Sequence, residues 1–230
     1  MVHPPTIFNL LEGVVPIAVQ ALAACTLLVL ILAWGVRRGL RGEDGIIPGE
    51  GFTLRNFLEL LLEGIVSLMR QTIGPTWPRY VPLVGTLGFF ILVSNLMGLL
   101  PGLGGPTSYV ETNLSWAILA VFVSEYVAFQ HQGAKSYLSH LAGPIWWLAP
   151  LMLVIELISH AARLLSLTVR LTGNMFADHT LVAVFLSIPV VAFFVPWIFM
   201  GLGVFVAFLQ AFIFSFLTII YIGLALEDAH

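Results

Sequence analysis

Charged residues are scarce in this 230-residue chain. Asp, Glu, Lys and Arg make up only 9% of it and hydrophobic residues make up 59%, whereas soluble domains carry about 25% charged residues. The mean hydropathy of +1.01 agrees with this. The one long stretch too polar for a bilayer, Arg37 to Arg55, is too short to form a soluble domain of ordinary size. The sequence therefore predicts a polytopic membrane protein whose function resides in its membrane segments.

Basic runs and cysteine are nearly absent as well. No cluster of Lys and Arg could follow a phosphate backbone, which argues against nucleic acid as a partner. Cys25 is the one cysteine, so an intrachain disulfide and a cysteine-based metal site are excluded, and we interpret it as a core residue. Residues 22–25, Leu-Ala-Ala-Cys, are similar to a lipoprotein processing site. Against cleavage there, no Lys or Arg precedes the segment and the apolar run continues to Trp34.

Long apolar runs set the predicted architecture, because a helix needs about 20 apolar residues to cross a hydrocarbon core of about 30 Å. They predict an all-α fold and a single integral membrane domain over residues 1–230, with five membrane-embedded helices at residues 14–36, 80–100, 113–130, 150–187 and 197–226. Glu125 interrupts the third of these. A turn is expected at Pro189 and Pro196, since the charge-free run from Thr180 to Leu226 is about twice the length of one span.

The last two predicted helices form a long inclined hairpin. Residues 150–187 would extend about 57 Å at 1.5 Å per residue, which is nearly twice the hydrocarbon thickness. This helix must therefore be steeply inclined, or broken near Gly173.

An amphipathic helix is predicted at residues 52–73. Polar side chains recur there at steps of three or four among apolar ones, at Arg55, Glu59, Glu63, Ser67 and Arg70. This pattern is typical of an interfacial helix on the cytoplasmic membrane surface. A helix buried against other subunits is the alternative.

Basic residues set the predicted orientation, because positively charged short loops stay in the cytoplasm. Six arginines lie between the first two spans and Lys135 lies between the third and fourth, whereas the loop 101–112 has Glu111 as its only charged residue. We therefore expect the N-terminus outside the cell and the C-terminus in the cytoplasm.

A stripe of polar residues runs along the fourth predicted helix. At 100° per residue, six of them lie within about 40° of one line, and they are Glu156, His160, Arg163, Arg170, Asn174 and Asp178. Ser159 lies beside this stripe. Each ionisable group at the bilayer centre costs about 2.5 to 3.5 kcal/mol on insertion scales, so we expect the stripe to be functional.

Arg170 is the ionisable member of the stripe that lies deepest in the helix. The residues three and four positions away from it include no carboxylate; they are Ser166, Leu167, Gly173 and Asn174. We therefore expect its partner on another helix or another chain. Snorkelling of the guanidinium to exposed carbonyls or lipid phosphate is the alternative, and the distance of Arg170 from both predicted helix ends argues against it.

The other polar residues allow more than one interpretation. Glu156, His160 and Arg163 could form a structural network, with His160 between the other two. His179 points about 140° away from the stripe, so it faces a different helix, where it could titrate or simply pack. The last helix has a face with one polar group among small and aromatic residues, which are Gly203, Ala207, Gln210, Phe214 and Tyr221. Opposite an unpaired arginine, Gln210 becomes a candidate site residue.

Three stretches resemble a known family. Residues 166–179 read Ser-Leu-Thr-Val-Arg-Leu-Thr-Gly-Asn-Met-Phe-Ala-Asp-His. Residues 95–102 read Asn-Leu-Met-Gly-Leu-Leu-Pro-Gly, and the last helix carries Leu-Gln-Ala-Phe-Ile-Phe at 209–214 and Leu-Thr-Ile-Ile-Tyr at 217–221. On these stretches the chain resembles subunit a of the bacterial rotary F-type ATP synthase, and the resemblance covers essentially its whole length.

The resemblance implies a proton-channel subunit of the bacterial inner (plasma) membrane that is not catalytic alone and needs no cofactor. Its implied partners are the ring of c subunits, the peripheral-stalk b subunits, the remainder of the ATP synthase and membrane lipid. Two offset half-channels would meet the rotating ring. Arg170 would attract a deprotonated ring carboxylate and prevent a direct proton leak, a role that suits a guanidinium because it does not deprotonate in proteins.

The resemblance also implies roles for other residues, with three departures from the family pattern. Asn174 and Gln210 match family positions near the arginine contact. Glu156 and His179 match positions that line the aqueous paths, and Ser159 and Arg163 match neighbouring positions on the cytoplasmic side. Many relatives have an acidic residue where His179 stands, a histidine where Gly203 stands and a phenylalanine where Thr172 stands. These departures leave open which group relays protons in the outer half-channel, for which Asp178 and Glu111 are further candidates.

Two other classes of protein fit these residues less well. An intramembrane zinc hydrolase would use His160 and His179, but no His-Glu-x-x-His pattern occurs and the two histidines lie on different helix faces. A secondary transporter with its site at Arg170 would show two related halves and paired broken helices, and the sequence shows neither. A transporter would also work alone, whereas subunit a needs the ring.

Overall fold

Helices make up all the regular structure in the described part of this computed structural model, which comprises residues 16–39, 54–100, 104–142, 146–187 and 195–227. Its α-helices are α1 (Ile17–Gly39), α2 (Leu54–Ile73), α3 (Val81–Leu99), α4 (Val110–Ala142), α5 (Ala149–Leu186) and α6 (Val195–Glu227). Short 3-10 helices, η3 (Gly74–Arg79), η4 (Pro106–Ser108) and η5 (Trp146–Leu148), precede α3, α4 and α5. Of the six α-helices in the described part of the chain, all except α2 contain a segment long and apolar enough to cross a membrane. This confirms the predicted all-α fold with five membrane-embedded helices.

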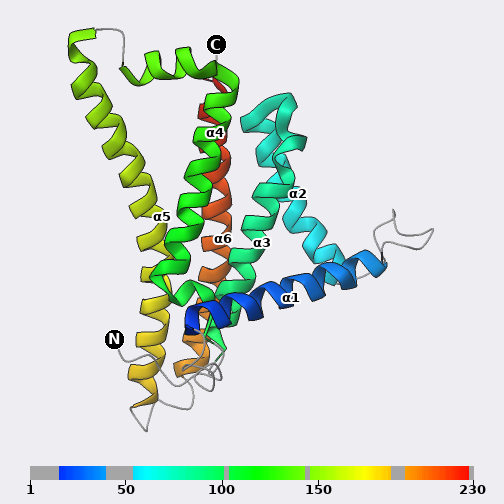
Figure 1. The fold of residues 1–230 in the computed structure, drawn as a ribbon. Coiled ribbons are helices and arrows are strands. Elements are labelled where there is room, and N and C mark those ends of the chain that lie inside the picture. The colour runs from blue at the N-terminus through cyan, green and yellow to red at the C-terminus, as the bar shows by residue number, and fades with distance from the viewer. Residues whose placement is uncertain (1–15, 40–53, 101–103, 143–145, 188–194, 228–230) are drawn as a thin grey trace.

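The helices are arranged around α6, which contacts α2, α3, α4 and α5 (Figure 1). α5 and α6 run antiparallel, and α5 slants away from α6 toward one end. α2 and α3 also run antiparallel and lie on the other side of α6. α1 crosses the foot of this bundle at a steep angle and packs on α3 through Cys25. The side chain of Cys25 is fully buried, so its interpretation as a core residue is confirmed.

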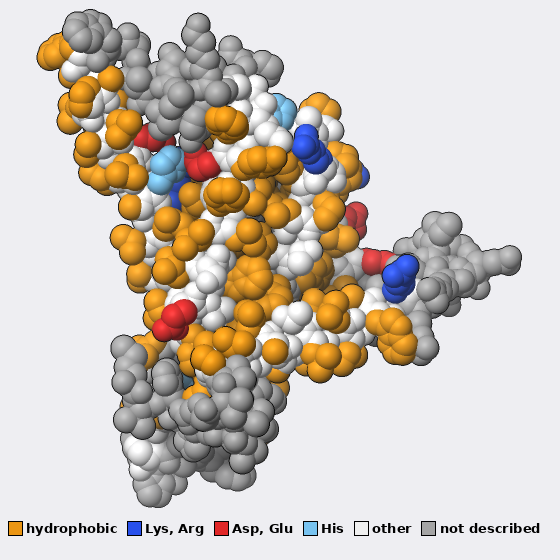
Figure 2. Space-filling view, in the orientation of Figure 1, with side chains coloured by type: hydrophobic (Ala, Val, Ile, Leu, Met, Phe, Trp, Pro, Cys, Tyr) orange, Lys and Arg blue, Asp and Glu red, His pale blue; other side chains and the backbone are white. Residues whose placement is uncertain are grey.

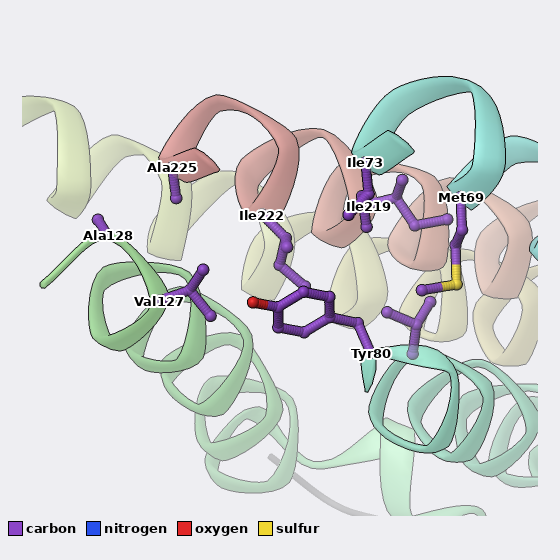
Figure 3. Close-up of a cluster of buried hydrophobic side chains, with 9 residues drawn as sticks. Met69, Ile73, Tyr80, Val127, Ala128, Ile219, Ile222 and Ala225 are labelled. Atoms are coloured by element: carbon purple, nitrogen blue, oxygen red, sulfur yellow. The ribbon is translucent and has the colours of Figure 1, made fainter. Parts of the chain in front are cut away.

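The core lies where α6 meets its neighbours. One cluster joins α2, α3, α4 and α6, and in it the ring of Tyr80 extends between Val127 of α4 and Ile222 of α6 (Figure 3). A second cluster joins α3, α4, α5 and α6 around Leu167 and Phe214, which are fully buried. Since lipid tails are as apolar as leucine, close packing rather than exclusion of water holds such helices together.

α2 buries its apolar face within this chain. Met69 is fully buried in the cluster with α6, and the ring of Phe57 meets Phe208 of α6 edge-on at a centroid distance of 5.9 Å. Glu63 and Arg70 are exposed on the opposite side. The amphipathic pattern of α2 therefore reflects, in part, packing on its own chain, while Leu60 of the same helix is 64% exposed.

Two helices differ in extent from the sequence prediction. α4 is longer than the predicted third span of residues 113–130, because the chain resumes helical structure after a kink at Gly133, where φ is 74°. Glycine tolerates this left-handed conformation, and beyond it the chain turns sideways toward α5 (Figure 1). α5 is one helix of 38 residues that continues through Gly173 without a break, so the broken alternative was wrong. Pro189 lies outside the described residues, and Pro196 is the second residue of α6, a position where a helix tolerates proline.

Candidate functional site

The polar stripe lies along the edge of the face that α5 presents to the rest of the chain. Because α5 is unbroken, its helical period keeps the six stripe residues on one side. All six side chains are half-buried, and so is Ser159. Leu167 and Leu171 are buried on the inner side of the stripe, whereas Leu165, Val169 and Phe176 are exposed on the outer side. The stripe is therefore accessible to a neighbour that covers the exposed apolar face of α5.

Arg170 has no partner among the described residues. No hydrogen bond or ion pair joins its guanidinium to another side chain or carbonyl in that part of the chain, and its side chain is only half-buried. The guanidinium stays charged at all physiological pH values. A permanent charge in an apolar segment is costly unless it is paired, and no pairing group for Arg170 lies in the described part of the chain.

Asn174 and Gln210 form a direct amide pair one turn from Arg170. The Nδ2 of Asn174 donates a hydrogen bond of 2.7 Å to the Oε1 of Gln210 and thereby links α5 to α6. Gln210 is only 3% exposed, and its Nε2 has no hydrogen-bond partner in the described chain. The face of α6 predicted from sequence is turned inward, since Ala207 and Phe214 are buried on it as well. Small residues on this face permit the close approach of the two helices.

A cluster of ionisable side chains lies between α4 and α5 on one side of Arg170. Its members are Glu125, Glu156, His160 and Arg163, and acidic, basic and histidine side chains gather in this region of the surface (Figure 2). His160 lies 3.4 Å from Glu156 through its Nε2 and 3.2 Å from Glu125 through its Nδ1. Arg163 lies 3.8 Å from Glu125 and stacks over the ring of Tyr221 at 5.0 Å.

The expected network of Glu156, His160 and Arg163 is therefore present only in part. His160 does contact Glu156, but the acidic partner of Arg163 is Glu125. Sequence reasoning missed Glu125 as a site residue and treated it as an interruption of a membrane span. The available signal was that an ionisable residue inside an apolar segment is functional by default.

On the other side of Arg170, Asp178 and His179 lie near the turn η4 and the start of α6. The Nε2 of His179 lies 3.3 Å from the Oγ of Ser108 in η4. A Cβ atom added to Gly203 would lie 3.5 Å from the Oδ2 of Asp178 and 2.6 Å from Leu99, so glycine at this position leaves room for both side chains. Glu111 is exposed in the first turn of α4.

Thr172 has a structural contact that a phenylalanine could not make. The Nδ2 of the fully buried Asn113 donates hydrogen bonds to the carbonyl of Thr107, at 2.7 Å, and to the Oγ1 of Thr172, at 2.9 Å. Asn113 thereby ties η4 to α5. Thr172, where many relatives have phenylalanine, thus helps to hold η4, the turn that carries Ser108, against α5.

We expect Thr172→Val to destabilise the protein without changing the shape of the site. The substitution leaves one N–H of Asn113 buried and unpaired, which costs about 1 kcal/mol or somewhat more, and it should lower the thermal midpoint in detergent by about 2 to 4 °C. Thr180→Val is the matched control, because the exposed Thr180 hydroxyl bonds only the Phe176 carbonyl of its own helix. Equal midpoints for the two variants would contradict this account of Asn113.

Metal ligands do not gather in the described part of the chain. No group of three or more His, Cys, Asp or Glu side chains there could hold a metal ion. His160 and His179 lie in separate clusters on opposite sides of Arg170. The arrangement instead provides polar and titratable groups along one helix, with an unpaired arginine between them.

Comparison with known proteins identifies the family of this chain. Residues 17–223 match the family described as ATP synthase A chain. ATP synthase subunit a 2 of Syntrophotalea carbinolica is 42% identical over 89% of this chain and 85% of its own length. ATP synthase subunit a of Desulfosudis oleivorans is 42% identical over 87% of this chain and 86% of its own length. ATP synthase subunit a of Geobacter sulfurreducens is 43% identical over 77% of this chain and 76% of its own length. These matches confirm the resemblance found in the sequence, and the chain belongs to the ATP synthase A chain family, the family of bacterial subunit a.

Proposed function

We propose that this chain translocates protons as the stator channel subunit of an ATP synthase, with two half-channels that meet a rotating ring of c subunits. The observation that carries the proposal is the half-buried Arg170, which lacks a partner in the described chain and borders an exposed apolar face. A carboxylate on a neighbouring ring helix would supply the missing charge. The guanidinium would attract that carboxylate without passing a proton itself.

The two polar clusters support two separate access paths. His160 precedes Arg170 by ten residues and Asp178 follows it by eight, which corresponds to about 15 Å and 12 Å along the helix axis. We assign Glu156, Ser159, His160 and Arg163 to the inner path. We assign Asp178 and His179 to the outer path. Asn174 and Gln210 would hold the polar contact between α5 and α6 beside the arginine.

As a member of its family, the chain is a membrane-sector subunit that is not catalytic alone. We place it in the bacterial inner membrane with the N-terminus outside and the C-terminus in the cytoplasm, as the distribution of Lys and Arg predicts. The c-ring, the peripheral-stalk b subunits and lipid would be its neighbours. Glu111, exposed at the start of α4, remains a further candidate for the outer path.

Reconstitution into liposomes tests the proposed function. We expect the purified chain alone to conduct no protons under a potassium diffusion potential, because each half-channel ends at a carboxylate that another subunit provides. The membrane sector containing this chain, the ring and the stalk should conduct protons, and the same sector without the chain should not. Proton uptake by the chain alone would favour a self-contained transporter and contradict the proposal. The measurement is the quenching of a pH-sensitive dye.

A further inference from the structure

We propose that Glu125 of α4 is a further proton-carrying residue of the inner path, in which Glu156, His160 and Glu125 form a carboxylate–imidazole–carboxylate relay. This inference rests on the proposed function and extends it to a residue on a different helix. The relay crosses from α5 to α4, so it would take the inner path away from the surface of α5 and into the chain.

The geometry places the imidazole between two acids. The Nε2 of His160 lies 3.4 Å from the Oε1 of Glu156, and its Nδ1 lies 3.2 Å from the Oε1 of Glu125. Each ring nitrogen therefore faces a different carboxylate. An imidazole can accept a proton at one nitrogen and release one from the other, and its ordinary pKa of about 6.5 lies close to physiological pH.

The positions of the two acids give the relay a direction. The side chain of Glu156 is 39% exposed, that of Glu125 is 28% exposed and that of His160 is 20% exposed. The Nδ1 of His160 is shielded from solvent and makes no aligned hydrogen bond. A proton on Nδ1 therefore leaves most directly through Glu125, after a small rotation of the ring or the carboxylate. Glu156 belongs to the stripe that borders the exposed face of α5, where the ring would lie, so it serves as the ring-side end. Glu125 on α4, which is also partly exposed, is the end that exchanges protons with water.

Among the described residues, Arg163 and Tyr221 are the other charged and titratable side chains in contact with the cluster. Arg163 lies 3.8 Å from Glu125, and its guanidinium stacks over Tyr221 of α6, which holds it on the Glu125 side.

The proton balance of one transfer involves these three residues and water. Protonated Glu156 gives its proton to Nε2, the imidazolium gives the proton on Nδ1 to the Glu125 carboxylate, and Glu125 releases it to water. At each step one O–H or N–H bond breaks as another forms, no oxidant is required, and ATP-driven pumping runs the same steps in reverse. The imidazole ends as its other tautomer and is reset by rotation of the ring before the next transfer.

The pH dependence of proton pumping tests the relay. ATP synthase containing Glu125→Gln is reconstituted in liposomes with its cytoplasmic side outward, and ATP-driven acidification is measured while the external pH is varied from about 5.5 to 8.5 around the imidazole pKa. We expect pumping to fall on the order of tenfold near neutral pH and the acidic limb of the pH profile to shift. His160→Gln should cause a similar loss, and the double variant should be no worse than either single one.

Controls separate this inference from the proposed function and from a structural role. Glu63→Gln removes an exposed carboxylate of α2 and should leave the profile unchanged. Glu125→Asp keeps the carboxylate and should restore much of the rate lost in Glu125→Gln, which a packing defect would not do. Should Glu125→Gln fail to assemble, His160→Asn carries the test, because it removes the imidazole and leaves both acids.

A wild-type pH profile for an assembled Glu125→Gln or His160→Asn complex would overturn the relay, and so would additive losses in the double variant. Neither result contradicts the proposed function, provided that Arg170→Ala still abolishes pumping in the same assay. Normal pumping by Arg170→Ala would instead overturn the proposed function itself.

Discussion

We expect the replacement of Arg170 with alanine to abolish ATP-driven acidification of inverted membrane vesicles while the complex stays assembled. Of the predicted variants, this one has the largest effect on function. The side chain is half-buried and has no hydrogen-bond or ion-pair partner in the described chain, so its removal breaks no such interaction there. Without the guanidinium, a ring carboxylate loses its counter-charge at the point where the two access paths come closest. A membrane potential of 100 mV, which provides about 2.3 kcal/mol per charge, would then drive leakage rather than rotation.

Two further variants make this test specific. Arg170→Lys keeps a positive charge but presents an ammonium that can lose its proton and lacks the fork of the guanidinium, so we expect impaired pumping with increased passive leakage. Arg37→Ala is the matched control, because Arg37 is an exposed arginine near the end of α1 and far along the chain from the stripe. Vesicle acidification is followed by dye quenching, and assembly by the retention of ATP hydrolysis on membranes. Pumping by Arg170→Ala at the wild-type rate would contradict the proposed role of the arginine.

The sequence predicted the stripe on α5 because a helical period is a local property. Spacing alone places Arg170, Asn174 and Asp178 on one side of a helix, and it also identifies the absence of a carboxylate one turn from the arginine. The sequence placed Gln210 opposite Arg170 and did not predict its pairing with Asn174. Its 2.7 Å hydrogen bond depends on how closely α5 approaches α6, which the small residues of α6 permit but do not specify.

Contacts between distant segments could not be predicted in the same way. Glu125 lies on α4 and meets His160 and Arg163 only because α4 packs beside α5. Hydropathy shows that a segment can cross a membrane but not which helices become neighbours. The kink at Gly133 was also missed, since a glycine in polar sequence does not by itself predict that helical structure resumes beyond it. The five apolar helices, by contrast, follow directly from composition.

Gly105 is the position where we expect the largest loss of stability. Its backbone is extended, with φ of −72° and ψ of 148°, so alanine could adopt this conformation. A Cβ atom there would nevertheless lie 2.5 Å from the carbonyl oxygen of Ser94 and 2.7 Å from the Cα and N of Gly98. These are backbone atoms of α3 and cannot move aside like a flexible side chain. Overpacking usually costs about 1 to 3 kcal/mol, and backbone contacts place Gly105→Ala at or above the upper end of that range.

The loss should extend to the outer path, because Gly105 immediately precedes η4. Displacement of η4 from α3 would move Ser108 away from His179 and would strain the hydrogen bond from Asn113 to Thr107. We therefore expect Gly105→Ala to lower the thermal midpoint of the detergent-solubilised protein more than Thr172→Val does, and to reduce proton pumping in parallel.

A graded pair of glycine variants isolates the cause of this loss. Gly98→Ala should be milder, since its Cβ would meet the flexible Met175 side chain at 3.2 Å and the Gly105 backbone only at 3.5 Å. Gly64→Ala, with no atom within 4 Å of the added Cβ, should be neutral or slightly stabilising because alanine favours the helical conformation. Thermal midpoints that decrease from Gly64→Ala through Gly98→Ala to Gly105→Ala would support a steric origin of the loss. Equal midpoints for the Gly64 and Gly105 variants would show that η4 does not depend on close contact with α3, and the outer path would then have to be positioned by α5 and α6 alone.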